Sequence, residues 1–286
     1  MIKELFVKTF KLVKYNLILI QPLLIFMLLF GMLVNIISGT VKTGPALIVL
    51  IVSFVGLFCA FLAGWFSMFH KCVQNSMNEN IDELQMTEKS LKLFHEFIPG
   101  IGKYFIKVLL GGILYVVLYY LFLQLAGYIG QHYIGFPAGI TQQSLVQASY
   151  SEAKSVEFVN KLSSPDKILL VKNYLLILFT TGIFSLITMF WLPAIIADDK
   201  NPFSAYVTSF LKVFQKPFQT MAIFVSYWLA SSIAIFINIL GTNNFIIQFL
   251  GLILYVFVVV YFITMIFLYY EGYSKNNCTG WTDRFR

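Results

Sequence analysis

Apolar residues gather in six long runs, and the segments between these runs carry nearly all of the charged residues. Each run has about 20 residues or more, and no charge lies near its middle. A helix that rises about 1.5 Å per residue crosses the ~30 Å hydrocarbon core of a bilayer with about 20 residues. The pattern therefore predicts six transmembrane helices, at 17–37, 46–69, 108–129, 174–196, 218–240 and 245–269.

Composition supports a membrane protein. Hydrophobic residues make up 59% of the chain and charged residues 12%, whereas soluble domains carry roughly 25% charged residues. We therefore predict an all-α fold, a polytopic transmembrane helical bundle that forms one integral membrane domain over residues 1–286. The first apolar run is too long for the apolar part of a signal peptide and has no small-residue cleavage pattern near its end, so we expect it to be retained.

The positions of the basic residues predict an orientation. Fifteen of the 20 Lys and Arg residues lie on the side of the two termini, and five lie on the other side. Because basic residues are retained on cytoplasmic loops, we expect both termini in the cytoplasm. The excess of Lys over Arg suits an AT-rich bacterial genome, which predicts the bacterial cytoplasmic membrane. This reading accounts for the net charge of +7, so we expect no nucleic-acid partner.

The long loop at 130–173 is predicted to be external. Its stretch 143–162 has helix-forming content. The sequence Ser164-Pro165-Asp166 then has the pattern of a helix start, with a cap, a proline in the first turn and an acid near the N-terminus. We expect the fourth transmembrane helix to begin there, outside the bilayer.

Short segments before three of the spans resemble one another. They read FVKTFK at 6–11, LKLFHEFI at 91–98 and YVTSFL at 206–211. In the first and last, aromatic residues recur four positions apart, as on one face of an amphipathic helix that lies at a membrane surface. Either the chain contains three copies of one unit, an amphipathic helix followed by two spans, or basic loops rich in Phe resemble one another by chance.

Small residues four positions apart predict where helices approach closely. They are Gly56, Ala60 and Gly64 in the second span, and Ala230 and Ala234 in the fifth. We expect these faces to pack within the bundle rather than to form a dimer seam.

Amide and hydroxyl side chains in or near the spans have two interpretations. Gln21, Asn35, Ser226 and Asn238 either form hydrogen bonds between helices or line a polar path for transport. The first interpretation is the more common in membrane proteins.

The chain lacks the usual signatures of membrane enzymes: no HExxH, GxSxG or Walker A sequence is present. The three cysteines are widely separated, and a metal site at His70 and Cys72 would need ligands such as His95 or Cys278 at spacings that match no known motif. We expect no catalytic residue, no metal and no cofactor. Asp198, Asp199 and Lys212 are candidates for lipid headgroup contacts, although Asn201-Pro202 after the two acids is also a helix-start signal.

The segment 191–206, WLPAIIADDKNPFSAY, continued through Ser209 and Phe210, resembles a signature of bacterial six-span membrane proteins. These are the YciC-like proteins and the membrane domain attached to some glycerophosphodiester phosphodiesterases. The matching residues are Pro193, Asp198, Asp199, Pro202, Ala205 and Ser209. The resemblance covers about the last hundred residues and brings no catalytic residues with it, and residues 1–286 contain no segment that we expect to form the soluble phosphodiesterase domain. It implies a protein that acts on membrane organisation, on transport or on a partner.

Three functions follow from the sequence. The first is a non-enzymatic integral membrane protein that organises lipids or a membrane protein partner through its interfacial helices and outer loop. The alternative is a transporter or a subunit of a transport system, which requires the four polar residues to converge on one cavity. The third, a lipid-active enzyme, is the weakest, because it requires His70, His95 and Asp198 or Asp199 to meet at the headgroup level.

Overall fold

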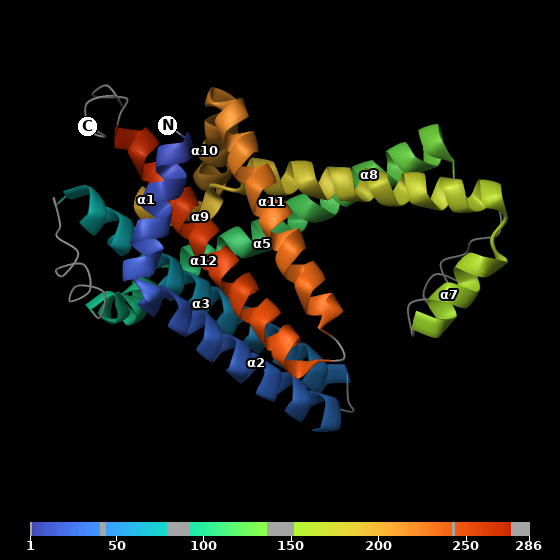
Figure 1. Ribbon diagram of the computed structural model, residues 1–286, viewed down its shortest axis with the longest axis horizontal. Coiled ribbons are helices and arrows are strands. Elements are labelled where there is room, and N and C mark those ends of the chain that lie inside the picture. Colours follow the sequence, from blue (N-terminus) through green and yellow to red (C-terminus); the bar gives the residue numbers. More distant parts are fainter. Residues whose placement is uncertain (1, 41–43, 79–91, 136–151, 242–243, 276–286) are drawn as a thin grey trace. The chain divides into compact units, whose positions relative to one another are not determined.

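The computed structural model describes residues 2–40, 44–78, 92–135, 152–241 and 244–275 (Figure 1), and within these ranges the chain forms helices and no strand. The helices are α1 (Ile2–Tyr15), α2 (Gln21–Thr40), α3 (Gly44–Asn78), α5 (Phe97–Ile129), α7 (Glu152–Lys161), α8 (Ser164–Thr188), α9 (Trp191–Ala197), α10 (Pro202–Gln215), α11 (Pro217–Leu240) and α12 (Phe245–Lys275). Short 3₁₀ helices lie at η1 (Leu17–Ile20) and η2 (Phe94–Glu96), and a π-helical turn lies at η3 (Gly130–Ile134).

Six helical segments of the described chain are long and apolar enough to cross a membrane, as the sequence predicts. They are Leu17–Asn35, Ile48–Met77, Phe94–Ile134, Ser164–Ala197, Pro217–Leu240 and Phe245–Gly272. The fold is thus that of an all-α, multi-pass membrane protein. The third segment has 41 residues and the fourth has 34, which is far more than their apolar runs, because these helices continue through polar residues at their ends.

The start of α8 confirms the predicted helix boundary and corrects its cap. Helix α8 begins at Ser164, but the capping hydroxyl belongs to Ser163. The Ser163 hydroxyl donates to Asp166 Oδ2 at 2.6 Å, and the Asp166 amide donates back to Ser163 Oγ at 3.3 Å. This reciprocal pair satisfies an amide that the first turn of a helix leaves free. In the predicted helical stretch 143–162, α7 occupies Glu152–Lys161, and residues 143–151 lie outside the described residues.

The chain divides into two compact units, Met1–Ile113 with Thr188–Arg286, and Leu114–Ile187. In the second unit the side chain of Phe184 is almost fully buried. Its ring lies 4.9 Å from Tyr115, 5.3 Å from Tyr119 and 5.1 Å from Phe122, between ring centroids. Tyr119 and Thr181 are joined by a hydrogen bond of 3.3 Å. These contacts pack α8 against the second half of α5.

The core of the first unit lies where α3, α9 and α12 meet. Its largest fully buried side chains include Phe69, Phe190, Phe267 and Tyr270. The rings of Phe66 and Phe267 lie 5.7 Å apart, and those of Phe190 and Tyr269 lie 5.8 Å apart. Away from this core, α2 and α11 expose apolar side chains such as Leu28 and Phe236, which is the surface that a helix in lipid presents.

A short sequence recurs toward the C-terminal ends of the second, fourth and sixth spans. A hydroxyl residue followed by Met stands at Ser67-Met68, at Thr188-Met189 and at Thr264-Met265. The three hydroxyl residues are all buried in the first unit. Corresponding positions of three spans are therefore all buried in one unit, which agrees with a threefold repeat of a helix pair.

Small residues allow close helix contacts at some of the predicted positions. A Cβ atom at Gly64 would lie 2.7 Å from the carbonyl oxygen of Phe97, and Ala234 is fully buried. Ala60 and Ala230 are half-buried. No described atom lies within 4 Å of the Cβ position at Gly56, so the close approach on α3 occurs at Gly64 instead.

Candidate functional site at the amphipathic helices α1 and α10

Helix α10 is fixed in place from its first residue. The side chain of Asn201 accepts a hydrogen bond of 2.8 Å from the Ser204 amide, and Pro202 follows as the first helical residue. This confirms the predicted helix start. Before it, Asp199 has a positive φ of 55° and is bonded by Lys107, whose Nζ lies 2.8 Å from the carboxylate and 2.9 Å from the carbonyl oxygen. The bond from Lys107 holds the pKa of the Asp199 carboxyl below its usual value.

The inner face of α10 is bound to the core by polar contacts. Tyr206 donates a hydrogen bond of 2.9 Å to the carbonyl oxygen of Gly111, and its ring stacks on Trp191 at 5.4 Å. The hydroxyl oxygen of Ser209 accepts a hydrogen bond of 3.0 Å from the amide of Phe190. This face cannot rotate outward without breaking these contacts, so the opposite face of α10 is held outward.

The outer face of α10 consists of bulky apolar side chains. Phe203 is 72% exposed and Phe214 is 61% exposed. Val207, Phe210 and Leu211 lie between them and are also exposed. A row of this kind on one face of a 14-residue helix is typical of a helix that lies in a membrane interface.

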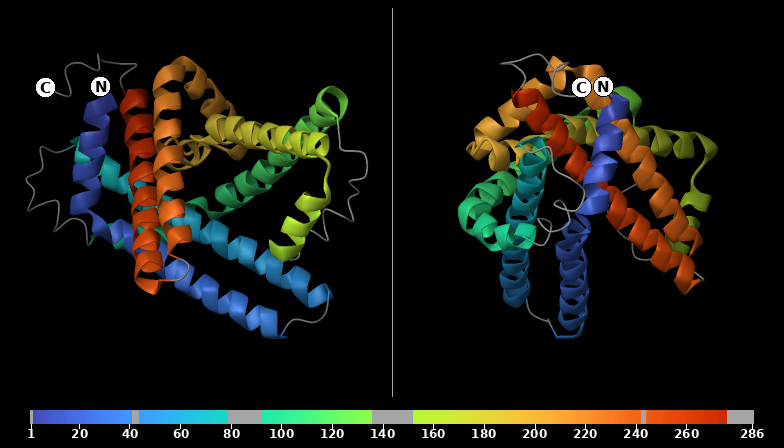
Figure 2. Two further views of the ribbon diagram at one scale, coloured as in Figure 1. Left: turned by 45° about the vertical axis from the view of Figure 1, so that its right-hand side comes forward. Right: turned by 60° about the vertical axis from the view of Figure 1, so that its left-hand side comes forward.

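Helix α1 packs lengthwise on α12, with contacts around the middle of α12 (Figure 2). Its buried residues are Leu5, Thr9, Leu12 and Val13. Tyr261 of α12 donates a hydrogen bond of 3.0 Å to the carbonyl oxygen of Phe6, and Phe10 meets Phe257 edge to face at 6.5 Å. The remaining face exposes Val7 and Phe10 together with lysines.

Helices α1 and α10 repeat one burial pattern, with partners two hundred positions apart in the chain. The buried pairs are Leu5 with Ala205, Thr9 with Ser209, and Val13 with Val213. The exposed pairs are Val7 with Val207, and Phe10 with Phe210. The third predicted copy differs: within the described residues 92–98, η2 leads directly into α5 and no separate amphipathic helix forms.

Beneath α10 lies a polar cluster that contains two of the predicted headgroup contacts. Tyr270 donates a hydrogen bond of 2.6 Å to Asp198, and Lys200 lies 3.5 Å from the same carboxylate oxygen. Lys212 Nζ lies 3.1 Å from the centre of the Tyr270 ring. Burial lowers the pKa of Lys212 to about 8, although the carboxylates of Asp198 and Glu271 favour its charged form. Asp198, Asp199 and Lys212 therefore all have partners within the protein.

The residues that a lipid-active enzyme would require have separate partners. His70 Nδ1 lies 2.8 Å from Glu271, and His70 Nε2 lies 2.9 Å from Gln74, whereas Asp198 is bonded to Tyr270 and Asp199 to Lys107. Within the described ranges no group of three or more His, Cys, Asp or Glu side chains is placed to hold a metal ion.

The four residues of the predicted polar path lie on two helices. Gln21 and Asn35 belong to α2, and Ser226 and Asn238 to α11. Asn35 donates a hydrogen bond of 2.9 Å to the carbonyl oxygen of Gly31 in its own helix. The backbone of Asn238 packs against Gly251 of α12. A Cβ atom added at Gly251 would lie 3.0 Å from the Asn238 amide nitrogen.

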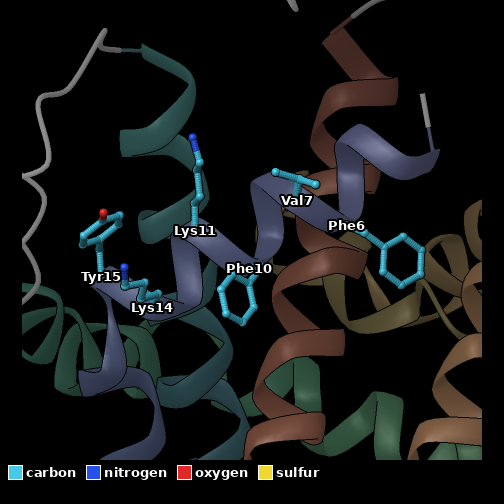
Figure 3. Close-up of a pocket in the computed structure, with 6 residues that line it drawn as sticks. All are labelled: Phe6, Val7, Phe10, Lys11, Lys14 and Tyr15. Atoms are coloured by element: carbon cyan, nitrogen blue, oxygen red, sulfur yellow. The ribbon is translucent and has the colours of Figure 1, made fainter.

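An open groove of about 490 Å³ lies along α1 (Figure 3). It is lined by Phe6, Val7, Phe10, Lys11, Lys14 and Tyr15. None of the four predicted path residues lines it. The pattern FVKTFK at 6–11 contains four of these six residues, and it predicts an amphipathic helix but not the groove.

Comparison of the chain with models of known families, with curated proteins and with solved structures found no match in any of the three.

Proposed function

We propose that this multi-pass membrane protein holds α1 and α10 in the lipid–water interface and thereby binds and orders the lipids of one leaflet. The observation that carries this proposal is the division of α10 into two faces. Its inner face is bonded to the core through Tyr206 and Ser209, and its outer face presents bulky apolar side chains.

The connections of α10 support its position at the membrane surface. The chain reaches it from α9, at the end of the fourth span, and leaves it directly into α11, the fifth span. A 14-residue helix is about 21 Å long, so it has the length to lie along the surface between two span ends. Full burial of one Phe side chain away from water is worth roughly 1.5–3 kcal/mol, and this favours insertion of the outer face among lipid chains.

Helix α1 occupies the equivalent position before the first span. It ends at Tyr15, and the first span begins at Leu17. Four spans lie between α1 and α10 in the chain. Because an even number of crossings returns the chain to the side where it started, α1 and α10 lie on the same side of the membrane. Their shared burial pattern supports a common role in that interface.

The functional groups of the first unit support a non-enzymatic role. The acids at its polar end are held by Tyr270, Lys107 and His70. These hydrogen bonds of the three acids join α3 to α12, and they join α5 and α12 to the turn before α10.

The test is a measurement of depth at the outer face of α10. Phe210→Cys, in a background with Cys278→Ser, is labelled with bimane and reconstituted in vesicles that contain lipids brominated at different depths of the acyl chain. Cys59 and Cys72 are buried and serve as a check for background labelling. We expect strong quenching by lipids brominated near the headgroup end of the chain.

Two control positions make the outcome interpretable. Leu229→Cys, at an exposed position in the middle of the fifth span, should be quenched by more deeply brominated lipids. Gln215→Cys, a polar position on α10 itself, should be quenched more by aqueous iodide. Quenching of the label at position 210 by iodide but by no brominated lipid would contradict the proposal, and so would quenching by neither, which would indicate that another protein covers the face.

A further inference from the structure

We propose that the groove along α1 is a binding site for one anionic phospholipid, whose phosphate is held by Lys11 and Lys14 and whose upper acyl carbons contact Val7 and Phe10. The inference rests on the proposed function in one respect, the placement of α1 in the interface. It goes further, because it names the chemical class of lipid and the residues that recognise it.

The groove combines the two surfaces that a phospholipid requires. Lys11 and Lys14 are exposed, and Val7 and Phe10 are about half exposed. Figure 3 shows the two lysines extending from the same stretch of helix as Phe10, with the Tyr15 ring beside Lys14. The Lys14 ammonium lies 5.3 Å from the centre of that ring. A free phosphate ion would use only the lysines, whereas an amphiphile also covers the apolar lining.

Charge distinguishes these two lysines from others of the first unit. Lys107 is paired with Asp199 at 2.8 Å, Lys200 with Asp198 at 3.5 Å, and Lys71 with Glu96 at 3.9 Å. Among the residues that the structure describes, neither Lys11 nor Lys14 has an acidic partner. Lys11 and Lys14 are three positions apart on one helix, so their like charges repel each other, and a bound anion relieves the repulsion.

The position of α1 sets the level of these ammonium groups. Lys14 stands three residues before Leu17, where the first apolar span begins. Lysine side chains near the end of a span extend toward the headgroups. The phosphates of the lipids lie at this level, and basic residues at a membrane surface favour anionic lipids.

The repeat provides an internal comparison. At the positions that correspond to Lys11 and Lys14, α10 carries Leu211 and Phe214, while Phe10 and Val7 correspond to Phe210 and Val207. Both helices thus have the apolar surface, and only α1 has the two exposed cations. We infer that α10 inserts without selecting a headgroup and that α1 selects an anionic one.

The test measures retained lipids by native mass spectrometry of the purified full chain in detergent. The protein is titrated with dioleoyl phosphatidylglycerol and, separately, with dioleoyl phosphatidylcholine, which has the same chains and no net charge. We expect phosphatidylglycerol to bind more tightly, and the double variant Lys11→Gln/Lys14→Gln to lose roughly tenfold in this affinity. The variant Lys11→Arg/Lys14→Arg should keep it.

A matched control removes two lysines elsewhere. Lys154→Gln/Lys161→Gln, at exposed positions of α7, should bind as the unaltered protein does. All variants should unfold at the same temperature, because the altered side chains are exposed. Equal affinity for the two lipids, an equal loss in the control, or displacement of the lipid by millimolar inorganic phosphate would each overturn the inference. Failure here with strong lipid quenching at position 210 would leave α10 in the interface, so the two proposals fail separately.

Discussion

The hydroxyl of Tyr270 donates a hydrogen bond of 2.6 Å to the carboxylate of Asp198. Tyr270 lies in the last span, and Asp198 follows the fourth span at the turn before α10. The bond therefore joins two span ends at the base of α10. Lys212, in the last turn of α10, lies over the ring of the same tyrosine, so one residue of α12 contacts both the turn before the amphipathic helix and its last turn.

Replacement of Tyr270 by Phe should destabilise the protein by about 1–2 kcal/mol, because it removes a hydrogen bond to a charged group and retains the ring beneath Lys212. The free energy of unfolding in mixed micelles of detergent and SDS measures this change. Tyr120→Phe, at a position that is 59% exposed, should change it by less than about 0.5 kcal/mol. Equal effects of the two substitutions would show that the bond contributes nothing.

Lys212 predicts a dependence of stability on pH. Its pKa in the folded protein is about 8, whereas an unfolded lysine titrates near ~10.4. Below pH 8 the cost of burying the charge is present in full. Between these two values the unfolded chain binds more protons than the folded one, so the contribution of Lys212 to stability should rise with pH.

The comparison with Lys212→Met isolates this contribution. The unfolding free energy of the unaltered protein minus that of the variant should increase from pH 8 to pH 10 and stay flat from pH 6 to pH 8. Lys161→Met, where the side chain is 74% exposed, should give no such slope. A flat difference at Lys212 across the whole range would show that its ammonium is well solvated.

Two glycines of α5 should respond in opposite ways to alanine. A Cβ atom at Gly111 would lie 2.5 Å from the ring of Trp191, which stacks on Tyr206 of α10, whereas at Gly102 no atom of the described residues lies within 4 Å of that position. Gly111→Ala should cost roughly 1–3 kcal/mol through overpacking. Gly102→Ala should be neutral or stabilise by up to about 1 kcal/mol, because alanine favours a helix. Thermal unfolding followed by circular dichroism measures both, and a stable Gly111→Ala protein would contradict the packing of Trp191.

The sequence predicts the spans and the start of α10 because these features are local. A run of apolar residues defines a span by itself, and Asn201 lies three residues from the Ser204 amide that it caps. The apolar pattern does not predict where the long helices end, because helix α3 continues to Asn78, past the apolar run that ends near Phe69. Nothing in hydrophobicity alone marks where such a helix stops.

The contacts that orient α10 could not be predicted, because their partners are far apart in the chain. Tyr270 and Asp198 are separated by 72 positions, and Tyr206 and Gly111 by 95. Two internal patterns carried part of this information. The Ser/Thr-Met pairs at Ser67, Thr188 and Thr264 mark positions that are buried in three spans, and the match of α1 with α10 indicates which faces are buried.

The central claim, that the outer face of α10 binds and orders lipid, is tested most directly by electron paramagnetic resonance of spin-labelled phosphatidylcholine around the reconstituted protein. The measured quantity is the number of motionally restricted lipids per protein molecule. We predict that Phe203→Ser/Phe210→Ser/Phe214→Ser lowers this number while the protein stays folded, and that Val156→Ser/Val159→Ser on α7 leaves it unchanged. An unchanged number in the α10 variant would contradict the account, because the lipids would then be held by the spans alone.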